Sequence, residues 1–158
     1  MNQEEYNSYL QKMMALCSKG EKCAFDIERK LRKWQVPEEQ IQHITEDLKS
    51  ERFIDHMRYT QAFVNDKLAF NHWGKIKIKY ALKERKIEEP IIEKVLSQIS
   101  PRYYEEILEE ELEKKYAKLL QKPDNKGKEK IIRYLTQKGF EYGKVFELVE
   151  ARINRDQQ

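Results

Sequence analysis

The chain has 158 residues, of which 37% are charged and 39% hydrophobic, with a net charge of +3. This length suits one domain or several small units around one core, and five Gly and four Pro are too few for the many tight turns of an all-β fold. No apolar run approaches the roughly 18 residues that cross a bilayer, and residues 1–12 are too polar for a secretory signal. We therefore expect an all-α, cytoplasmic protein that does not enter a membrane.

Three segments of the chain repeat one spacing of apolar residues, with steps of 4, 5, 5 and 3 positions. In each segment, the pair four apart predicts the buried face of a short helix, and the last three positions predict the face of the next helix. Such a recurrence indicates a tandem repeat. The three sets are Ile27, Leu31, Val36, Ile41 and Ile44; Ile78, Leu82, Ile87, Ile92 and Val95; and Ile131, Leu135, Phe140, Val145 and Leu148.

A further amphipathic helix is predicted before each of these pairs, with apolar faces within residues 9–17, 59–63 and 103–120. The sequence thus predicts three tandem three-helix repeats forming an elongated, curved helical array. The expected boundaries are residues 1–54 for the first repeat, 55–99 for the second and 100–155 for the third, with a short tail at 156–158.

Two junctions between these units carry the residues of a helix start. Asp55 suits an N-cap, with Ile54 and Tyr59 placed as the two halves of a hydrophobic staple. Ser100 repeats the cap and is followed by Pro101, which suits the first helical position. Because the device recurs, we interpret Asp55 as a structural joint and not as a catalytic group or a metal ligand.

Basic residues concentrate in the second repeat, where residues 66–86 contain seven bases and two acids. On a helix over residues 74–86, four of the lysines fall within a sector of about 80°. Such a stripe can follow phosphates or an acidic protein wall, or it can be a solvated helix face. The predicted partner-binding or DNA-binding residues are Lys75, Lys77, Lys79, Lys83, Lys86 and Trp73, with Lys128, Lys130 and Arg133 in the third repeat.

Trp73 could stack on a base or anchor a protein interface, or it could fold back onto the core. The stripe is almost wholly Lys, which favours backbone attraction over base reading.

No catalytic constellation is present in the sequence. It lacks a Gly-rich phosphate loop, an H-E-x-x-H motif and a G-x-S-x-G motif. Cys17 and Cys23 do not share a ligand spacing with the three scattered histidines, so we expect free thiols and no zinc site. We expect no enzymatic activity, no cofactor and no metal.

The chain resembles the RecX family, the bacterial regulators of the recombinase RecA. The resemblance rests on FIDHMRYTQAFVNDK at residues 53–67 and GKIKIKYALKERKI at residues 74–87, with CAFDIERKL at 23–31 and KGF at 138–140. It covers roughly residues 10–153. It implies an all-helical protein of three three-helix repeats that lies along the groove of the RecA–DNA filament. The implied partners are the RecA filament and, weakly and non-specifically, single-stranded and double-stranded DNA. The implied effect is restraint of filament growth, ATP turnover and strand exchange by a monomer.

The sequence departs from the family pattern at several positions. His56 stands where the family usually has a second acid, Thr60 replaces Ala, Lys67 replaces Arg and Cys23 replaces a capping Ser. Lys86 replaces the Gly of a helix end, where positive φ strains any side chain, so we expect a different turn geometry there.

Two other functions remain open from the residues alone. A direct DNA-binding protein of helix-turn-helix type uses the same three-helix units and predicts salt-sensitive binding to bare duplex DNA. A helical scaffold for an unrelated protein partner needs no nucleic acid.

Overall fold

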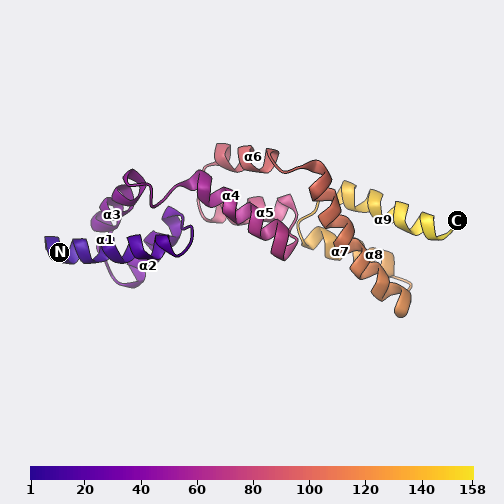
Figure 1. Ribbon diagram of the computed structural model, residues 1–158. Coiled ribbons are helices and arrows are strands. Elements are labelled where there is room, and N and C mark those ends of the chain that lie inside the picture. The colour runs from indigo at the N-terminus through magenta and orange to yellow at the C-terminus, as the bar shows by residue number, and fades with distance from the viewer. The chain divides into compact units, whose positions relative to one another are not determined.

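The computed structural model describes residues 1–158 as nine α-helices and one π-helical turn, without strands (Figure 1). The all-α prediction is thereby confirmed. None of the helices combines the length and the apolar character that crossing a bilayer requires. The elements are α1 (Gln3–Ser18), α2 (Ala24–Lys33), α3 (Glu38–Ser50), α4 (His56–Asp66), η1 (Lys67–Asn71), α5 (Lys75–Glu84), α6 (Glu89–Ser97), α7 (Pro101–Gln121), α8 (Gly127–Gln137) and α9 (Tyr142–Asp156).

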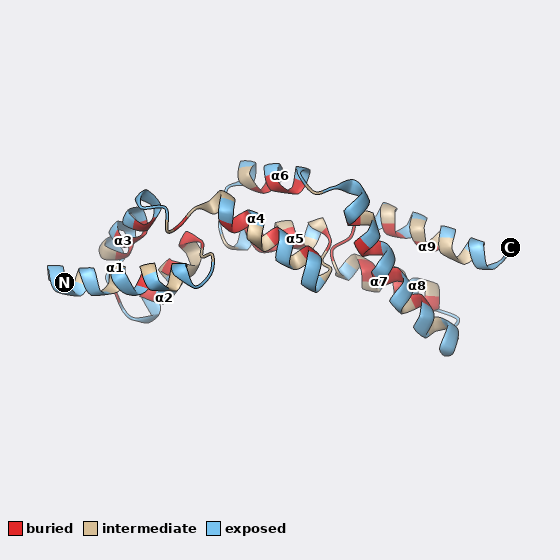
Figure 2. Cartoon of the chain, viewed as in Figure 1, coloured by how far each residue is buried: buried red, intermediate tan, exposed pale blue.

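The chain forms two compact units. The first comprises Met1–Phe63 with Leu82–Ile92, and the second comprises Val64–Ala81 with Glu93–Gln158. In the first unit, α3 packs against both α1 and α2. Its core consists of buried, mostly aliphatic residues, and Figure 2 shows buried positions in red along helices that are otherwise largely exposed. The core residues include Met13, Ile27, Leu31, Val36, Ile41, Ile44, Leu48 and Ile54.

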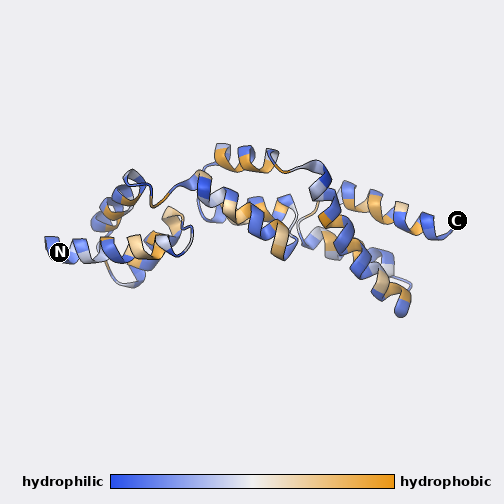
Figure 3. Ribbon diagram, viewed as in Figure 1, coloured by the Kyte–Doolittle hydropathy of each residue, from blue (hydrophilic) through white to orange (hydrophobic).

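In the second unit, α7, α8 and α9 pack against one another, and η1 packs against α7. Apolar and polar residues alternate along these helices with helical periodicity, as Figure 3 shows by colour. Each helix therefore has one face to bury and one face for water. The buried side chains include Tyr104, Leu108, Leu112, Leu135, Phe140 and Val145.

The apolar spacing seen in the sequence corresponds to the core positions of each repeat. Every residue of the three sets is buried except Leu148, which is half-buried. Each repeat contains three α-helices: α1 to α3 in the first, α4 to α6 in the second and α7 to α9 in the third. The prediction of three tandem three-helix repeats is confirmed.

The turn between the second and third helices of each repeat has one geometry. Gln35, Lys86 and Gly139 occupy equivalent positions and all have positive φ, at 61°, 58° and 101°. The expectation that Lys86 would avoid this conformation is wrong. Two hydrogen bonds hold it there, because the Lys86 N–H donates to the Lys83 carbonyl at 3.0 Å and the Ile87 N–H to the Leu82 carbonyl at 3.1 Å. These bonds satisfy carbonyls that the helix end would leave unpaired.

A close backbone approach joins the second repeat to the third inside the second unit. A Cβ on Gly74 would lie 2.2 Å from the carbonyl carbon of Gly139 and 2.2 Å from the nitrogen of Phe140. The Gly74 N–H donates to the Lys138 carbonyl at 2.7 Å, and the Ile76 N–H donates to the Gly139 carbonyl at 3.0 Å. Two of the N–H groups that the start of α5 leaves unpaired, those of Gly74 and Ile76, thus find acceptors in the turn after α8.

Lys86→Gly should stabilise the protein by about 1 kcal/mol, because a side chain in the left-handed region costs about that much. Chemical denaturation at neutral pH measures the free energy of unfolding of both proteins. Gln35→Gly is a second instance of the same change in another repeat. A loss of stability in both variants would contradict the strain argument.

Gly74→Ala should destabilise the protein by about 3 kcal/mol, because the added methyl group meets backbone atoms that cannot move aside independently. The matched control is Gly143→Ala, whose Cβ meets no atom within 4 Å; its effect should stay within about 1 kcal/mol. Thermal and urea unfolding of the two variants give the comparison. Equal effects at the two positions would show that the backbones can separate at little cost.

Candidate functional site

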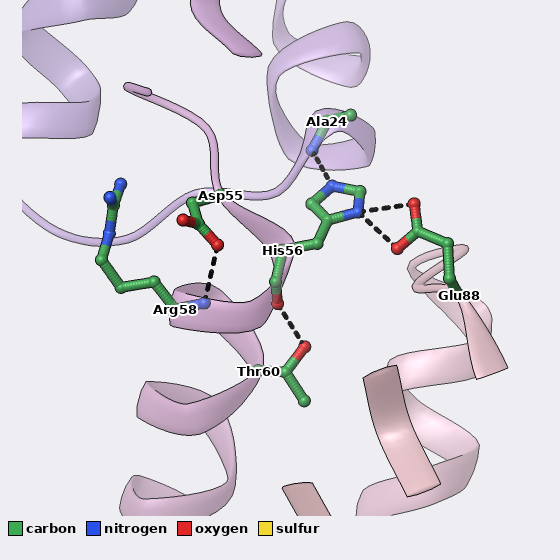
Figure 4. Close-up of polar contacts among 6 residues, drawn as sticks. All are labelled: Ala24, Asp55, His56, Arg58, Thr60 and Glu88. Carbon is green, nitrogen blue, oxygen red and sulfur yellow. Dashed lines mark hydrogen bonds and ion pairs between the residues drawn. The ribbon is translucent and has the colours of Figure 1, made fainter. Parts of the chain in front are cut away.

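His56 connects the first repeat to the second through hydrogen bonds on both of its ring nitrogens (Figure 4). Its Nε2 accepts from the backbone N–H of Ala24, the first residue of α2, at 3.1 Å. Its Nδ1 lies 2.8 Å from a carboxylate oxygen of Glu88. Since Nε2 accepts a bond from an amide, the proton of the neutral ring belongs on Nδ1, where it is donated to Glu88. His56 thus supplies an acceptor where the family pattern has an acid.

Tyr104 makes the corresponding connection between the second repeat and the third. Its hydroxyl accepts from the backbone N–H of Lys75, the first residue of α5, at 2.9 Å. The same hydroxyl donates to the carboxylate of Glu141. Burial, followed by the Glu141 hydrogen bond, raises the pKa of Tyr104 far above its usual value, so the proton stays on the phenol. Both junctions therefore place a group that accepts from a helix-start amide and donates to a glutamate.

Asp55 makes the contact of a helix cap. Its Oδ1 accepts from the Arg58 N–H at 3.0 Å, and Ile54 and Tyr59 on either side are buried (Figure 4). Ser100 does the same at the start of α7, where its hydroxyl accepts from the Tyr103 N–H at 3.2 Å. Both side chains thus make the hydrogen bond of an N-cap.

The lysines on α5 differ in their partners. Lys79 pairs with Glu93 at 2.5 Å, and Lys83 lies 3.7 Å from Glu89. The Lys75 ammonium lies 4.8 Å from the centre of the Tyr104 ring. Lys86 is exposed on the positive-φ turn, without an acidic partner. The predicted stripe therefore contains two lysines that pair with carboxylates, Lys79 and Lys83, and two without an acidic partner, Lys75 and Lys86.

Lys77 lies apart from these lysines and contacts Trp73. Its ammonium is 4.4 Å from the centre of the indole ring, and that of Lys67 is 4.6 Å from the same centre. Lys77 has no acidic partner. Trp73 is half-buried, and its role in binding a partner stays a prediction.

The third-repeat cations divide in the same way. Lys128 pairs with Glu150, and its ammonium lies 5.3 Å from the centre of the Phe146 ring. Lys130 pairs with Asp124. Arg133 is exposed and has no acidic partner.

Sequence reasoning missed several surface features of the second unit. Ile76 and Tyr80 of α5 are hydrophobic, yet their side chains are 57% and 67% exposed. Phe70, which the sequence analysis did not single out, lies in the π-helical turn η1 that follows α4. Its one sequence signal is an aromatic side chain within a basic segment.

Glu111 holds the turn that carries Trp73 in place. Glu111 is 4% exposed, and its carboxylate lies 3.3 Å from the Lys138 ammonium and 3.2 Å from His72 Nδ1. Lys138 also donates to the carbonyl of Asn71. Desolvation alone would raise the pKa of Glu111, but the charge of Lys138, its hydrogen bond and the charge of Lys114 outweigh it and hold the pKa below its usual value.

The fold and these junctions define a class of protein, a tandem array of three-helix units with basic surface residues. Two family models match the chain: the second three-helix domain of RecX at residues 55–96 and the third at residues 103–149. The Regulatory protein RecX of Clostridium acetobutylicum is 30% identical over 153 residues, which cover 93% of this chain and 71% of that protein. The chain belongs to the RecX family.

Other relatives agree with this assignment. Regulatory protein RecX of Streptococcus agalactiae serotype V is 30% identical over 134 residues, which are 84% of this chain and 51% of that protein. The chain thus spans about half the length of this relative. A crystal structure of regulatory protein RecX matches with a TM-score of 0.81 at 24% identity, covering 92% of this chain and 71% of that one. The structure of RecX from Lactobacillus salivarius matches at 0.80 and 20% identity, covering 96% and 97%. These two establish the shared fold.

Glu111→Gln should destabilise the protein by about 1–3 kcal/mol at neutral pH, because Lys138 loses a charged partner. Since the pKa of Glu111 is lower in the folded protein than in the unfolded chain, the stability it contributes is present above the unfolded pKa and is lost as the pH falls through the folded pKa. The stability difference between wild type and variant, measured by urea unfolding, should therefore shrink in acid. Glu110→Gln, at an exposed neighbour, is the control. A difference that stayed constant with pH would rule out this coupling.

Proposed function

We propose that this protein is a non-enzymatic regulator that binds the groove of the RecA–DNA filament and restrains filament growth, ATP hydrolysis and strand exchange. It would act as a monomer in the cytoplasm, in recombination and SOS repair. The observation that carries the proposal is the RecX family membership, which extends through the second and third repeats. The curated relatives bear the name of a regulatory protein.

The arrangement of titratable groups supports a binding role. His56 and Tyr104 are engaged at the repeat junctions, and Glu111 and His72 hold a turn in place. Each of these groups has structural partners, and none faces a second group in the geometry of a nucleophile and its base. An effect on ATP turnover would then come from contact with another enzyme.

Cations without acidic partners are the best candidates for contacts to the filament. This condition is met by Lys75, Lys77, Lys86 and Arg133, whereas Lys79 and Lys130 pair with carboxylates. A compensated lysine must give up its ion pair before it gains a phosphate or a carboxylate of a partner, so its net contribution is smaller. We therefore expect the basic residues without a carboxylate partner to contribute most to binding.

The test is single-stranded-DNA-dependent ATP hydrolysis by the RecA of the same organism. The wild type should inhibit it, and Lys77→Gln/Arg133→Gln should require about tenfold more protein for the same effect, because two charge-assisted contacts are lost. Lys79→Gln/Lys130→Gln removes the same net charge from paired side chains and serves as the control. Unfolding curves establish that the variants are equally folded.

Other outcomes separate the alternatives. Inhibition that both double variants retain would keep the regulator and discard these contact residues. If the wild type did not inhibit RecA but bound bare duplex DNA with a steep salt dependence, the helix-turn-helix DNA-binding function would replace this proposal. Absence of both effects would favour a protein scaffold.

A further inference from the structure

The end of α4 carries an exposed aromatic group that the fold does not use. Phe70, in the π-helical turn η1, is 82% exposed, more than any other large hydrophobic side chain of the protein. Lys67 belongs to the same turn, and Trp73 and Lys77 follow it closely. Lys67, Phe70, Trp73 and Lys77 are called here the aromatic–basic cluster. They all belong to the second unit.

Two positive charges converge on one ring in this cluster. The ammonium groups of Lys67 and Lys77 lie 4.6 Å and 4.4 Å from the centre of the Trp73 ring, so they can be at most 9.0 Å apart. Lys77 has no carboxylate to balance it. Like charges held this close repel each other, and the face of the indole compensates only part of that repulsion. The site therefore favours an anion.

The backbone that presents the cluster is held before any ligand arrives. The Trp73 N–H donates to the Lys67 carbonyl at 3.0 Å, and Lys138 donates to the carbonyl of Asn71. His72 has a φ of 52° and contacts the buried carboxylate of Glu111. A preordered turn loses little conformational entropy when it binds.

We propose that the aromatic–basic cluster is a binding site for single-stranded nucleic acid, in which Phe70 stacks on an unpaired base and Lys67 and Lys77 hold adjacent phosphates. A base offers an apolar face to Phe70 and carries the anion that the lysines attract. Duplex DNA hides its base faces, so the stacking contact selects a single strand. The inference rests on the proposed function and deepens it, since it gives the protein a direct contact with the DNA strand of its partner filament.

The other tryptophan lacks this arrangement. Trp34 also lies near two lysines, Lys12 at 5.7 Å and Lys30 at 5.6 Å, but its ring packs against Tyr9 with centroids 6.0 Å apart. No side chain as exposed as Phe70 accompanies it. Because the chain has two tryptophans, Trp34→Phe leaves Trp73 as the single fluorescent reporter of the cluster.

The experiment uses the full chain with the Trp34→Phe change and titrates it with a labelled oligothymidylate, without RecA. Binding should quench Trp73 emission. Phe70→Ala should weaken the affinity about tenfold, as the loss of one stacked base does, and Lys77→Gln should lower the slope of log affinity against log salt by about 0.7. Tyr142→Ala, which removes another exposed aromatic side chain at 62% exposure, should leave both quantities unchanged.

Three results would overturn the inference. They are wild-type affinity in Phe70→Ala, equally tight binding of a duplex of the same length, and equally effective competition by polyglutamate, which would assign the cluster to an acidic protein surface. Phe70 is too exposed for its loss to unfold the chain, and a thermal melt verifies this. RecA inhibition is scored separately: inhibition without oligothymidylate binding rejects the cluster and keeps the regulator, and binding without inhibition does the opposite.

Discussion

The second unit depends on the contact between two glycines. Gly74 precedes α5, and Gly139 lies in the turn after α8. A Cβ on Gly74 would collide with the backbone of Gly139 and Phe140, and a Cβ on Gly139 would collide with Lys77. This approach lets the turn after α8 accept hydrogen bonds from the N–H groups of Gly74 and Ile76. A helix start that would otherwise need water or a side-chain cap is thus completed by the next repeat, and α5 is fixed where it presents Lys77 beside Trp73.

The two repeat junctions solve one problem with different side chains. Each needs a group that accepts from the first amide of a helix and donates to a glutamate at a later turn. His56 does this between Ala24 and Glu88, and Tyr104 does it between Lys75 and Glu141. The amides stand 51 residues apart and the glutamates 53 apart, the same offsets as the apolar pattern. Polar groups at the junctions are therefore part of the repeat, even though the residue at the centre varies.

Much of the fold was predictable for two reasons. The spacing of apolar residues identifies the buried face of each helix, and the type of residue at a helix start identifies its cap. The spacing of Ile78, Leu82 and Ile87 identified core positions, and Asp55 and Ser100 were identified as helix starts. The geometry of Lys86 was not predictable from propensity, since two backbone hydrogen bonds outweigh the strain of its positive φ. Propensity describes one residue, whereas the turn is set by the helix end and the buried residue that follows it.

The candidate site was predictable only as a list of cations. Whether a lysine is compensated depends on a carboxylate from another helix, and Glu93 for Lys79 lies outside any local spacing rule. The same limit hid the convergence of Lys67 and Lys77 on the Trp73 ring, which involves the π-helical turn η1 after α4. Such turns are frequent at functional sites. A basic stripe in the sequence thus identifies a helix that is rich in positive charge. Which of these charges can bind a partner depends on the carboxylates that neighbouring helices place beside them.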